Sequence, residues 1–568
     1  MSEPFWQKSY PAGVRWELEV EEKPVEKLLD EALAQWPNRT MVDFLDKKLS
    51  YSEIADLADR AAAGFQKLGV KKGVHVGLYL PNTPHYIICF FGILKAGGTV
   101  VNYSPLDAER ELEHKIEDSE TDILVTLDLK LLYSKMQSML GKTRLKKLVV
   151  GGLQDFLPFP KNFLFPLVKG KEIAKHPRDD KHLRFKDLIA NDGRYEKPAR
   201  GDVKEEIACL QYTGGTTGLP KGAMLTHYNL MAATQCLTQW TNDGEKKVLM
   251  PGEETALAVL PLFHIYALTV ILLLGIAGGT TIILHPRFEL EDVMKDLQKK
   301  RPTVFPGVPT MYSAILAHPD AGSADLTSLK FCGSGGAPLP LDVQQRFEQV
   351  TGCRLTEGWG MTETSAPGVG TPLFGVYKPG SAGIPFPGIT IEFTDVDDPD
   401  KVVPYGERGE ICVTGPNVMK GYWKRPDATE EAFQGGRFHT GDVGYMDEDG
   451  YLFIVDRMKD MILSGGFNVY PRNIEDAIYL HPDVNECTVI GVEDDYRGQS
   501  AKAFITLNDG AAEFSLDDLK SFLGDKLGKH EMPQFLEFRD ELPKTPVGKL
   551  SKKELYEEER LKKEQASA

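Results

Sequence analysis

The sequence contains few cysteines, and none of them is placed for a metal site or a disulfide framework. Seven cysteines are spread singly over 568 residues, and no two of them form a Cys-x-x-Cys pair. A chain of this length can bury a core large enough to fold without disulfide bonds. We therefore expect a protein of a reducing compartment, with no zinc ribbon.

Basic residues are also in deficit. Lys and Arg total 66 against 83 for Asp and Glu, which gives a net charge of −17. A DNA or RNA backbone needs a basic face on its partner, so this balance argues against nucleic acid. A nucleotide remains a candidate ligand because it is held by local groups rather than by net charge. With 42% hydrophobic and 26% charged residues, the composition is that of a folded globular protein.

An uninterrupted apolar run of membrane-spanning length is missing as well. Residues 255–286 contain no Asp, Glu, Lys or Arg, but Pro261, His264 and the pair Gly278-Gly279 interrupt them. A spanning helix needs about 20 continuous apolar residues, so we expect a strand, a buried helix and a second strand here. The N-terminus lacks the basic start and apolar core of a signal peptide. These features predict a cytoplasmic protein.

Helical and extended patterns alternate along the first third of the chain and again over residues 256–305. Apolar residues recur at helical spacing over 25–36 and over 54–68, where Ser52 is the expected N-cap. An apolar helix is expected at 86–96. The strands expected in and between these regions are 74–80, 99–103, 123–126, 207–210, 256–260, 281–284 and 304–305. This alternation predicts parallel sheets covered by helices on both faces.

Two regions break the alternation. Residues 145–186 mix Phe and Leu with Lys, and prolines interrupt them. Residues from about 375 to 455 contain Gly- and Pro-rich turns between short strands, which indicates a β-rich subdomain, and a βα pattern resumes after Arg457. The predicted fold class is therefore α/β. We expect a large N-terminal domain, 1–456, of parallel-rich sheets covered by helices plus the β-rich subdomain, and a small C-terminal α+β domain, 457–568.

A glycine- and threonine-rich segment, YTGGTTGLPKG, spans residues 212–222 and follows an apolar strand. Glycines let backbone N–H groups approach phosphate oxygens closely, and the hydroxyls and Lys221 add donors and charge. The segment is not a Walker loop, because Gly222 rather than Ser or Thr follows the lysine. A flexible linker is the alternative, but linkers rarely combine such a loop with a lysine and an upstream buried strand. We predict a phosphate-binding loop.

Three further segments are weaker signals by themselves. GWGMTET (358–364) offers a carboxylate for Mg²⁺ and a hydroxyl for a phosphate or acyl oxygen. GSGGAPL (333–339) offers small residues against which a planar ring could lie, and HTGD (439–442) places a carboxylate on a tight turn suited to ribose hydroxyls. Each alone also has an ordinary explanation: an exposed helix start, a Gly-rich turn and a β-turn aspartate.

The order of the motifs is more specific than any one of them. The loop at 212–222 is followed by LPLFH (260–264), GSGGAP, GWGMTE, HTGD, DRMKDMILSGG (456–466) and PKTPVGK (543–549). This succession resembles the adenylate-forming superfamily of acyl- and aryl-CoA synthetases, luciferases and peptide-synthetase adenylation domains, over nearly the whole chain. LPNTPHYIICFFGILKAGGTVVNYSPL (80–106) and PLFHIYALT (261–269) are most similar to bacterial long-chain fatty-acid CoA ligases.

The resemblance implies a two-step ligation of a fatty acid to CoA. A carboxylate is a poor acyl donor, so attack on the α-phosphate of ATP first gives acyl-AMP and pyrophosphate, and the CoA thiol then displaces AMP. ATP and CoA are the implied co-substrates and Mg²⁺ the implied metal. A medium-chain or aryl-CoA synthetase, or an enzyme that loads a separate carrier protein, remains an alternative because these enzymes share the motifs.

The resemblance also implies roles for residues that match the family motifs. Glu363 and Thr217 would hold Mg²⁺, and Thr362 would bond near the α-phosphate. Lys549 would neutralise charge that develops during the attack on ATP, and His264 would stand where the acyl group meets CoA. The residues implied for ATP or AMP are Thr213, Gly214, Gly215, Thr216, Thr217, Gly218 and Lys221 for the phosphates, Gly336, Ala337, Pro338 and Trp359 for adenine, and Asp442 and Arg457 for ribose.

A conformational change between the two steps is implied too. The C-terminal domain would swing about a hinge at Lys459, and Gly465 and Gly466 would flank the pantetheine path, where a side chain would obstruct it. Many relatives carry Glu where this chain has Asn473, so no role is carried over to that position.

The acyl chain is expected to pass Gly333 and Gly335, whose small size would leave a channel open beside the adenine wall. Some long-chain relatives carry a gating Trp four residues after the motif histidine. This chain has Leu268 there, so we expect Leu268 in the acyl pocket and no such gate.

Segment 145–186 interleaves apolar and basic residues inside an acidic protein. This composition is typical of a segment that lies on an anionic lipid surface. Peripheral contact through residues 153–178, on the inner face of the membrane, is one interpretation. A surface loop whose Phe residues pack back onto the domain is the other. The family resemblance adds a homodimer as a further candidate assembly.

Overall fold

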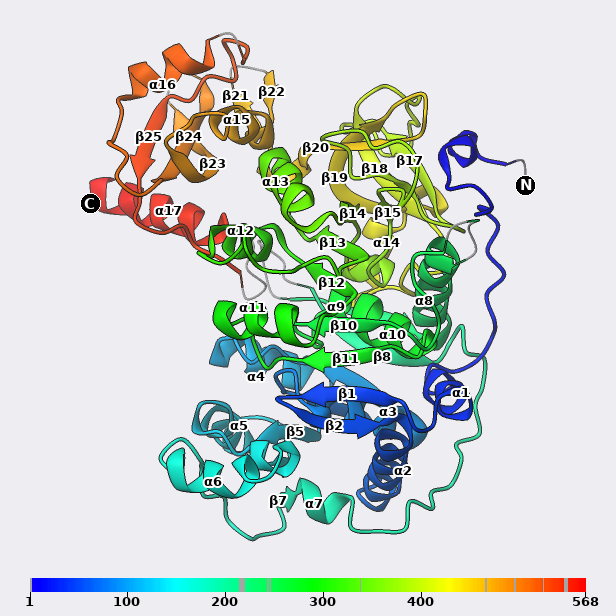
Figure 1. Cartoon of the computed structure of the whole chain (residues 1–568). Coiled ribbons are helices and arrows are strands. Elements are labelled where there is room, and N and C mark those ends of the chain that lie inside the picture. The colour runs from blue at the N-terminus through cyan, green and yellow to red at the C-terminus, as the bar shows by residue number, and fades with distance from the viewer. Residues whose placement is uncertain are drawn as a thin grey trace. The chain divides into compact units, whose positions relative to one another are not determined.

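The computed structural model describes residues 3–213, 220–242, 245, 247–337, 339–464, 467–494, 497–524, 526–545 and 550–567 (Figure 1). Contacts divide the chain into two compact units. Unit 1 comprises residues 1–215, 219–390 and 414–431, and unit 2 comprises residues 216–218, 391–413 and 432–568. The domain boundary predicted at residue 456 concerns motion about a hinge and stays a prediction.

A seven-stranded sheet carries the first half of unit 1. Its order is β7-β6-β5-β3-β4-β8-β9, and all neighbours are parallel except the β8–β9 hairpin. The central strands are buried at every position, as expected for a parallel sheet covered on both faces. The strands are β3 His75–Leu78, β4 Thr99–Asn102, β5 Ile123–Leu127, β6 Lys147–Gly151, β7 His182–Arg184, β8 Ile207–Tyr212 and β9 Gly222–Thr226. The helices of this half are α1 Lys27–Gln35, α2 Tyr51–Lys67, α3 Pro84–Lys95, α4 Glu109–Asp118, α5 Lys130–Lys142, α6 Lys161–Val168 and α7 Phe185–Leu188.

A nine-stranded sheet carries the second half of unit 1. Its order is β16-β15-β14-β13-β12-β10-β11-β1-β2, parallel from β14 to β1 and antiparallel at both ends. The strands are β1 Thr40–Phe44, β2 Lys47–Ser50, β10 Thr255–Ala258, β11 Thr281–Leu284, β12 Val304–Gly307, β13 Phe331–Gly335, β14 Leu355–Trp359, β15 Val369–Gly370 and β16 Ile384–Pro385. Its helices are α8 His227–Asn242, α9 Ile265–Ala267, the π-helix η3 Leu268–Leu273, α10 Leu274–Ala277, α11 Leu290–Lys299, α12 Pro309–Ala317 and α13 Leu341–Thr351.

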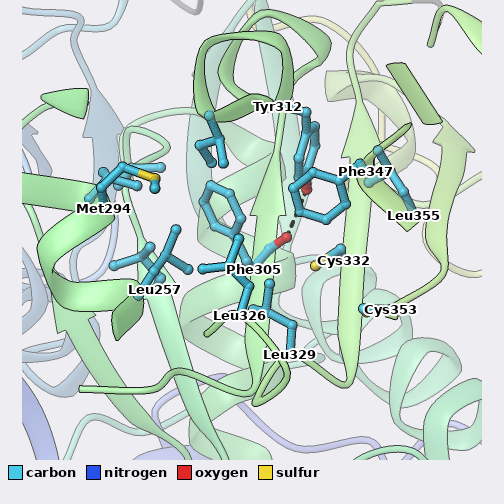
Figure 2. Close-up of a cluster of buried hydrophobic side chains, with 14 of the residues drawn as sticks. Leu257, Met294, Phe305, Tyr312, Leu326, Leu329, Cys332, Phe347, Cys353 and Leu355 are labelled. Carbon is cyan, nitrogen blue, oxygen red and sulfur yellow. Dashed lines mark hydrogen bonds between the residues drawn. The ribbon is translucent and has the colours of Figure 1, made fainter. Parts of the chain in front are cut away.

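A hydrophobic cluster fixes the position of β13 in this sheet. Phe305 of β12, Tyr312 of α12 and Phe347 of α13 pack together in it (Figure 2). The Tyr312 hydroxyl is shared between the carbonyl oxygens of Phe305 at 2.8 Å and Gly333 at 2.9 Å. A buried hydroxyl with such partners avoids the cost of an unsatisfied polar group. The cluster therefore supports the strand that carries Gly333 and Gly335.

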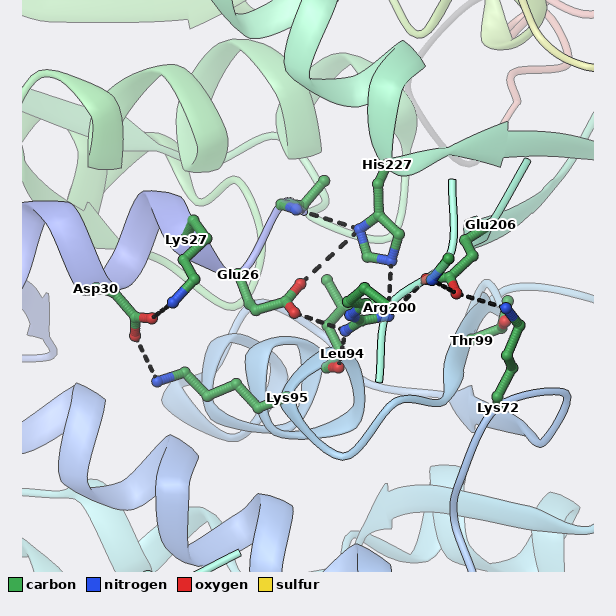
Figure 3. Close-up of polar contacts among 12 residues, drawn as sticks. Glu26, Lys27, Asp30, Lys72, Leu94, Lys95, Thr99, Arg200, Glu206 and His227 are labelled. Atoms are coloured by element: carbon green, nitrogen blue, oxygen red, sulfur yellow. Dashed lines mark hydrogen bonds and ion pairs between the residues drawn. The ribbon is translucent and has the colours of Figure 1, made fainter. Parts of the chain in front are cut away.

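A buried polar cluster ties the chain before α1 to the start of α8 within unit 1 (Figure 3). The Arg200 guanidinium lies 2.6 Å from Glu26 and 3.3 Å from Glu206. Nδ1 of His227 accepts a hydrogen bond from the backbone N–H of Val25 at 3.1 Å. Burial, followed by the positive charge of Arg200, lowers the pKa of His227 to about 3. His227 is therefore neutral near pH 7.

Unit 2 contains two sheets. The four-stranded sheet has the order β17-β18-β19-β20, and β19 pairs antiparallel with both β18 and β20. The strands are β17 Thr390–Thr394, β18 Gly409–Thr414, β19 Phe438–Met446 and β20 Leu452–Arg457. The five-stranded sheet has the order β22-β21-β24-β23, and β25 also pairs with β24. Its strands are β21 Ile462–Ser464, β22 Phe467–Val469, β23 Val484–Asp494, β24 Gly498–Leu507 and β25 Phe535–Phe538. Helices α15 Pro471–Ile478, α16 Leu516–Leu523 and α17 Lys553–Ser567 accompany it, and α14 Pro426–Ala432 precedes β19 in the chain.

The predicted fold class is confirmed by this mixed α/β architecture. The strand predicted at 281–284 coincides with β11, and the helix predicted at 86–96 is α3. Residues 255–286 form strands around a buried helical segment, as predicted. Among the described residues, no helix is both long and apolar enough to cross a membrane. Each of the seven cysteines is a buried free thiol.

The predicted N-cap of the second helix is wrong by two residues. The cap is Ser50, whose hydroxyl accepts from the Glu53 N–H at 3.2 Å while the Glu53 carboxylate accepts from the Ser50 N–H at 2.7 Å. This reciprocal capping box needs an acid three residues after the cap, and Ser52 has Ala55 there. The Ser52 hydroxyl instead donates to the carbonyl oxygen of Pro37.

Candidate functional site

The predicted phosphate loop lies in the turn of the β8–β9 hairpin. Tyr212 pairs with Gly222 across the hairpin, and the Thr213 N–H donates to the carbonyl oxygen of Lys221 at 2.9 Å. Thr213 and Lys221 thus pair at the base of the loop, and these two residues are called the loop neck below. The loop residues Gly214, Gly215, Thr216, Thr217 and Gly218 lie outside the described part of the chain.

Tyr422 connects the predicted phosphate lysine to the predicted metal carboxylate. Its hydroxyl donates to Oε1 of Glu363 at 2.8 Å, and Nζ of Lys221 lies 4.6 Å from the centroid of its ring. Burial, together with the negative charge of Glu363, raises the pKa of Tyr422. The hydroxyl therefore stays protonated near neutral pH and acts as the donor. Lys221 and Glu363 come from separate motifs, and one side chain contacts both.

The segment that carries Tyr422 is fixed by β9, the strand that follows the loop. The Met224 N–H donates to the Gly421 carbonyl oxygen at 2.9 Å, and the Trp423 N–H donates to the Gly222 carbonyl oxygen at 2.8 Å. Ala223 and Tyr422 form the bridge between the two segments. The position of Tyr422 is therefore set by the same backbone that ends the phosphate loop.

The GWGMTET motif spans the end of β14 and a tight turn. Trp359 is half-buried and pairs with Val369 of β15, while Thr362 begins the 3₁₀ turn η4 (Thr362–Thr364) that carries the buried Glu363. The turn ends in a left-handed residue, Ser365, with φ of 54°. Asn417 holds this conformation, because its amide donates to the carbonyl oxygens of Thr364 and Pro367, both at 2.7 Å.

Two hydrogen bonds bring the His264 segment to the other motifs. Gln211, near the end of β8, donates to the carbonyl oxygen of Phe263 at 2.8 Å. Thr269 of η3 donates to the carbonyl oxygen of Ser365 at 2.8 Å. His264 itself is half-buried, and its Nδ1 accepts from the Tyr266 N–H at 3.3 Å. The structure therefore gathers the loop neck, His264 and the Glu363 turn in one region of unit 1.

The predicted acyl-pocket glycines face Tyr266. A Cβ added at Gly335 would lie 3.2 Å from the Tyr266 ring, and the Tyr266 hydroxyl donates to the Gly333 carbonyl oxygen at 3.0 Å. The tyrosine ring thus lies beside both glycines, where the sequence predicts a channel. Gly336 follows with φ of 81°, a left-handed conformation suited to glycine. Ala337 comes next, and Pro338 lies outside the described residues.

A cavity lies between α8, β10 and the helical segment 268–277. Its lining includes Thr238, Thr241, Val270, Ile271, Leu274 and Phe331. Phe331 stands on the same face of β13 as Gly333 and Gly335, because alternate residues of a strand share a face. The mostly apolar cavity therefore adjoins the strand on which the acyl pocket was predicted, and Leu268 is buried at the start of η3.

Asp442 and Arg457, the two residues predicted for ribose, are cross-strand neighbours in unit 2. They pair across β19 and β20, and Nε of Arg457 lies 3.0 Å from Oδ1 of Asp442. Glu410 supports the turn before Asp442, since its Oε1 accepts from the Gly441 N–H at 2.9 Å and its Oε2 lies 2.7 Å from Nδ1 of His439. The structure thus places these two residues side by side, and their role at the ribose stays a prediction.

Lys459 lies exposed in the short 3₁₀ turn Met458–Asp460 of unit 2. Next to this turn in the chain, burial raises the pKa of Asp456 to about 6. Its carboxylate accepts from the backbone N–H groups of Arg457 at 2.8 Å and Arg472 at 2.7 Å. Gly465, Gly466 and Lys549, predicted for the CoA path and the adenylation step, lie outside the described residues.

Glu475 lies two residues after Asn473, the position at which this chain differs from many relatives, and it connects elements of the C-terminal part of unit 2. Its Oε1 accepts from the Val489 N–H at 2.8 Å and lies 3.0 Å from Nζ of Lys552. Burial acts to lower the pKa of Lys552, but the charges of Glu475 and Asp456 raise it. Lys552 is thus a buried cation with carboxylate partners, which indicates a structural role three residues after Lys549.

Sequence reasoning missed Tyr422, Asn417 and Tyr266. Tyr266 lies inside the quoted PLFHIYALT motif, so its position was available although no role was given to it. Tyr422 and Asn417 lie in a turn-rich stretch with no hydrophobic period, and Tyr422 is 59 residues from Glu363 in the chain. No local pattern marks a contact over that separation.

Models of two protein families match the chain. The model described as AMP-binding enzyme matches residues 29–423, and the model described as AMP-binding enzyme C-terminal domain matches residues 473–549. A relative from Bacillus subtilis (strain 168), named long-chain-fatty-acid–CoA ligase, is 40% identical over 559 residues, which cover 98% of both chains. A feruloyl-CoA synthase from Amycolatopsis sp is 36% identical and covers 93% of this chain and 99% of its own.

Solved structures agree with these relatives. ATP-bound MatB from Rhodopseudomonas palustris superposes with a TM-score of 0.82 at 28% identity, covering 94% of this chain and 99% of its own. The o-succinylbenzoate coenzyme A synthetase MenE from Bacillus subtilis, in complex with ATP and magnesium ion, gives a TM-score of 0.75 at 27% identity and covers 93% and 98%.

Proposed function

Because the chain belongs to the AMP-binding enzyme family, we propose that it is an acid–thiol ligase that joins a long-chain fatty acid to coenzyme A with cleavage of ATP to AMP. The observation that carries the substrate class is the 40% identity, over 98% of both chains, to a long-chain-fatty-acid–CoA ligase. The observation that carries the chemistry is the arrangement in which the buried Tyr422 contacts both the buried Glu363 and the half-buried Lys221 beside a predicted phosphate loop.

The reaction proceeds in two balanced steps. A fatty-acid carboxylate oxygen attacks the α-phosphorus of ATP, the bond from that phosphorus to the β-bridging oxygen breaks, and pyrophosphate leaves. The CoA thiol, on losing its proton, then attacks the acyl carbonyl, and AMP leaves. Acyl-AMP is thus formed in the first step and consumed in the second.

The phosphates are assigned to the neck of the β8–β9 hairpin. Lys221 supplies a positive charge, and Thr213 supplies a hydroxyl and a backbone group at the start of the loop. Thr362 precedes Glu363 in the η4 turn and is placed to bond near the α-phosphate. Gly214, Gly215, Thr216, Thr217 and Gly218 are proposed to complete the cradle with backbone donors.

The residues present fit a magnesium ion. Mg²⁺ is usually bound through one or two carboxylates together with substrate phosphates and water. Glu363 supplies one buried carboxylate, and its Oε1 is already held by Tyr422. Glu363 and, as proposed, Thr217 would hold the ion, which would neutralise negative charge on the phosphates.

The remaining groups of the nucleotide are assigned by motif. Trp359, Gly336, Ala337 and Pro338 are proposed for adenine. In unit 2, Asp442 and Arg457 are proposed for the ribose hydroxyls. Their 3.0 Å ion pair supports this assignment, because it orients the Asp442 carboxylate as a hydrogen-bond acceptor.

The acyl chain is proposed to enter beside His264 and to extend along β13 toward the cavity behind Phe331. Gly333, Gly335 and the buried Leu268 line this route. The Tyr266 ring lies against Gly335 and its hydroxyl reaches Gly333, so a long chain requires that side chain to turn aside.

The second step is assigned to residues 457–568. We propose that these residues move about Lys459 after acyl-AMP forms, which withdraws Lys549 and brings Gly465 and Gly466 to the pantetheine path. The family resemblance supports this proposal, and the exposed position of Lys459 is compatible with a change of backbone angles.

An aryl-CoA synthetase is the second candidate function, and the 36% identity to a feruloyl-CoA synthase favours it. Enzymes that load a carrier protein are a third. Pyrophosphate–ATP exchange tests the adenylation step for all three, because it needs the acid and no CoA. Exchange with palmitate that exceeds exchange with ferulate supports the proposed function, and the reverse order contradicts it.

Contact with a membrane surface is proposed for the segment that holds α6. Phe156 is only 7% exposed and packs on His85, whereas Phe159, Phe163, Leu167 and Val168 are 84%, 68%, 71% and 75% exposed. The start of segment 153–178, at Phe156, therefore packs onto unit 1. In contrast, α6 has no buried residue along 161–168. Exposed Lys171, Lys175 and Arg178 follow, which suits an anionic lipid surface.

Vesicle flotation tests this contact. We expect the chain to float with phosphatidylglycerol vesicles and the triple variant F159S/F163S/L167S to remain in the vesicle-free fraction at the bottom of the gradient. The matched control is L131S/V376S/L480S, which removes three exposed apolar side chains elsewhere. Equal flotation of both triple variants would contradict the proposal. Light scattering of the protein without vesicles tests the candidate homodimer by its mass.

A further inference from the structure

Tyr422 contacts two groups with linked roles in the proposed function, Lys221 for the phosphates of ATP and Glu363 for the magnesium ion that accompanies them. Its hydroxyl donates to Oε1 of Glu363 at 2.8 Å, and its ring lies 4.6 Å from Nζ of Lys221. Both Tyr422 and Glu363 are only 7% exposed. A contact of this kind, shielded from water, restrains both partners more than a surface contact does.

We propose that Tyr422 is a positioning residue, which orients the Glu363 carboxylate for the metal ion and the Lys221 ammonium for the phosphates. This inference rests on the proposed function, since Mg²⁺ and ATP are assigned to these residues there. Tyr422 itself touches neither substrate nor metal in this proposal. It acts through Glu363 and Lys221.

The hydroxyl half of the proposal concerns one carboxylate oxygen. Because the Tyr422 hydroxyl donates to Oε1, the rotation of the Glu363 carboxylate is restricted. Hydrogen bonds to metal-binding side chains of this type typically change metal affinity by about 10- to 100-fold. Loss of the hydroxyl alone should therefore weaken metal binding and leave the lysine in place.

The ring half of the proposal concerns Lys221. A lysine ammonium over an aromatic face is attracted by the ring electrons, and this contact holds the side chain at the neck of the loop. Phenylalanine would keep the contact, whereas leucine would remove it. The two halves are therefore separable by two substitutions at one position.

Hydrogen bonds of the backbone fix the position of Tyr422 relative to Glu363 and to β9. Tyr422 bridges to Ala223 of β9, and its N–H donates to the Thr429 hydroxyl at 2.9 Å. The Met419 N–H donates to the Glu363 carbonyl oxygen at 2.7 Å. The segment 419–422 is thus fastened both to the strand after the loop and to the turn that carries Glu363, so Tyr422 has little freedom to leave either partner.

Mn²⁺ binding tests the inference without turnover. Mn²⁺ is titrated by electron paramagnetic resonance in the presence of the ATP analogue AMPPNP and without any carboxylic acid, so that no adenylation takes place, and AMPPNP binding is measured separately with EDTA. For Tyr422→Phe we expect Mn²⁺ affinity to fall about 10-fold or more, with AMPPNP affinity in EDTA unchanged. For Tyr422→Leu we expect both affinities to fall.

A matched control and a double mutant exclude a general structural effect. Tyr51→Phe removes another buried tyrosine hydroxyl of unit 1, one that donates to the Thr280 carbonyl oxygen at 2.9 Å, and should leave both affinities unchanged. In the Glu363→Gln background, Tyr422→Phe should cause no further loss of Mn²⁺ affinity, because the carboxylate it orients is gone.

Two results would overturn the inference. One is unchanged Mn²⁺ affinity in Tyr422→Phe, and the other is an equal loss of Mn²⁺ and metal-free AMPPNP binding in that variant. A failure of the proposed function looks different, because the wild-type chain itself would then bind AMPPNP no more tightly with Mn²⁺ than with EDTA. That result would remove the metal role of Glu363 and the inference with it.

Discussion

The Glu363 region of unit 1 and the Asp442 region of unit 2 each present a buried carboxylate, but they differ in how its partner is held. Glu363 is bonded to Tyr422, a residue that is only 7% exposed, and its turn is fastened by two 2.7 Å bonds from Asn417. Asp442 is paired with Arg457, whose side chain is 47% exposed. The carboxylate proposed for the metal is therefore held in place within unit 1 before any ligand binds, whereas the carboxylate proposed for ribose is paired with a side chain that solvent reaches. The residues proposed for the second step also belong to unit 2.

The largest expected effect separates the two proposed half-reactions, both of which use residues of unit 2. Lys549→Ala removes a positive charge needed while the carboxylate attacks ATP, and loss of such a group typically costs about 10²–10³ in rate. We expect pyrophosphate release to fall by that factor. Conversion of chemically supplied acyl-AMP to acyl-CoA should be retained, because in the proposed mechanism Lys549 leaves the site before the second step.

Gly466→Leu is the complementary variant. Its side chain should obstruct the pantetheine path, so acyl-AMP accumulates and thioester formation is lost. Equal damage to both steps in Lys549→Ala and in Gly466→Leu would rule out separate positions for the two half-reactions.

A smaller effect is expected in unit 1 from Gly335→Trp. The new ring would meet Tyr266, whose ring atoms lie 3.2 Å from a Cβ at this position. We expect the ratio of palmitate to octanoate kcat/KM to fall by about 10-fold or more, since a filled pocket discriminates by chain length. An equal loss for both acids would instead indicate damage to the adenine wall.

The two units should also respond to pH with opposite sign, and the larger effect lies in unit 1. His227 has a pKa of about 3 in the folded chain against an ordinary value of 6.5, so the unfolded chain binds its proton first as pH falls. The free energy of unfolding should therefore drop between pH 6.5 and 3, by up to about 1.4 kcal/mol per pH unit. Denaturant titration of His227→Gln should show a shallower slope, and a slope equal to that of the wild type would contradict this origin.

In unit 2, Asp456 works in the other direction. Its folded pKa of about 6 lies above the ordinary 3.8, so its contribution to stability is present below pH 3.8 and is lost as pH rises to 6. We expect amide hydrogen exchange of β20, compared at equal intrinsic rates, to be slower at pH 5 than at pH 7. Asp456→Asn should abolish the difference, while Asp540→Asn, an exposed control in the same unit, should keep it.

Local patterns predicted the elements of unit 1 well because their residues alternate between apolar helices and buried strands. The strand at 281–284 and the helix at 86–96 are examples, since β11 and α3 lie there. Residue type alone predicts Ser52 as the N-cap. Ser50 is the cap instead because the Glu53 carboxylate accepts from its N–H and completes the capping box. The motifs placed Lys221 and Glu363 in a site, but the contact of each with Tyr422 depends on long-range packing that no spacing encodes. The exposure of Phe159 beside the burial of Phe156 depends on packing in the same way.

The central claim is that this chain ligates long-chain fatty acids to CoA. AMP and acyl-CoA formation should be measured with ATP, Mg²⁺ and CoA across acetate, octanoate, palmitate, oleate, benzoate and ferulate. We predict one AMP for each acyl-CoA and the highest kcat/KM for palmitate or oleate. A kcat/KM for benzoate or ferulate that is higher than for every alkyl acid would contradict the account.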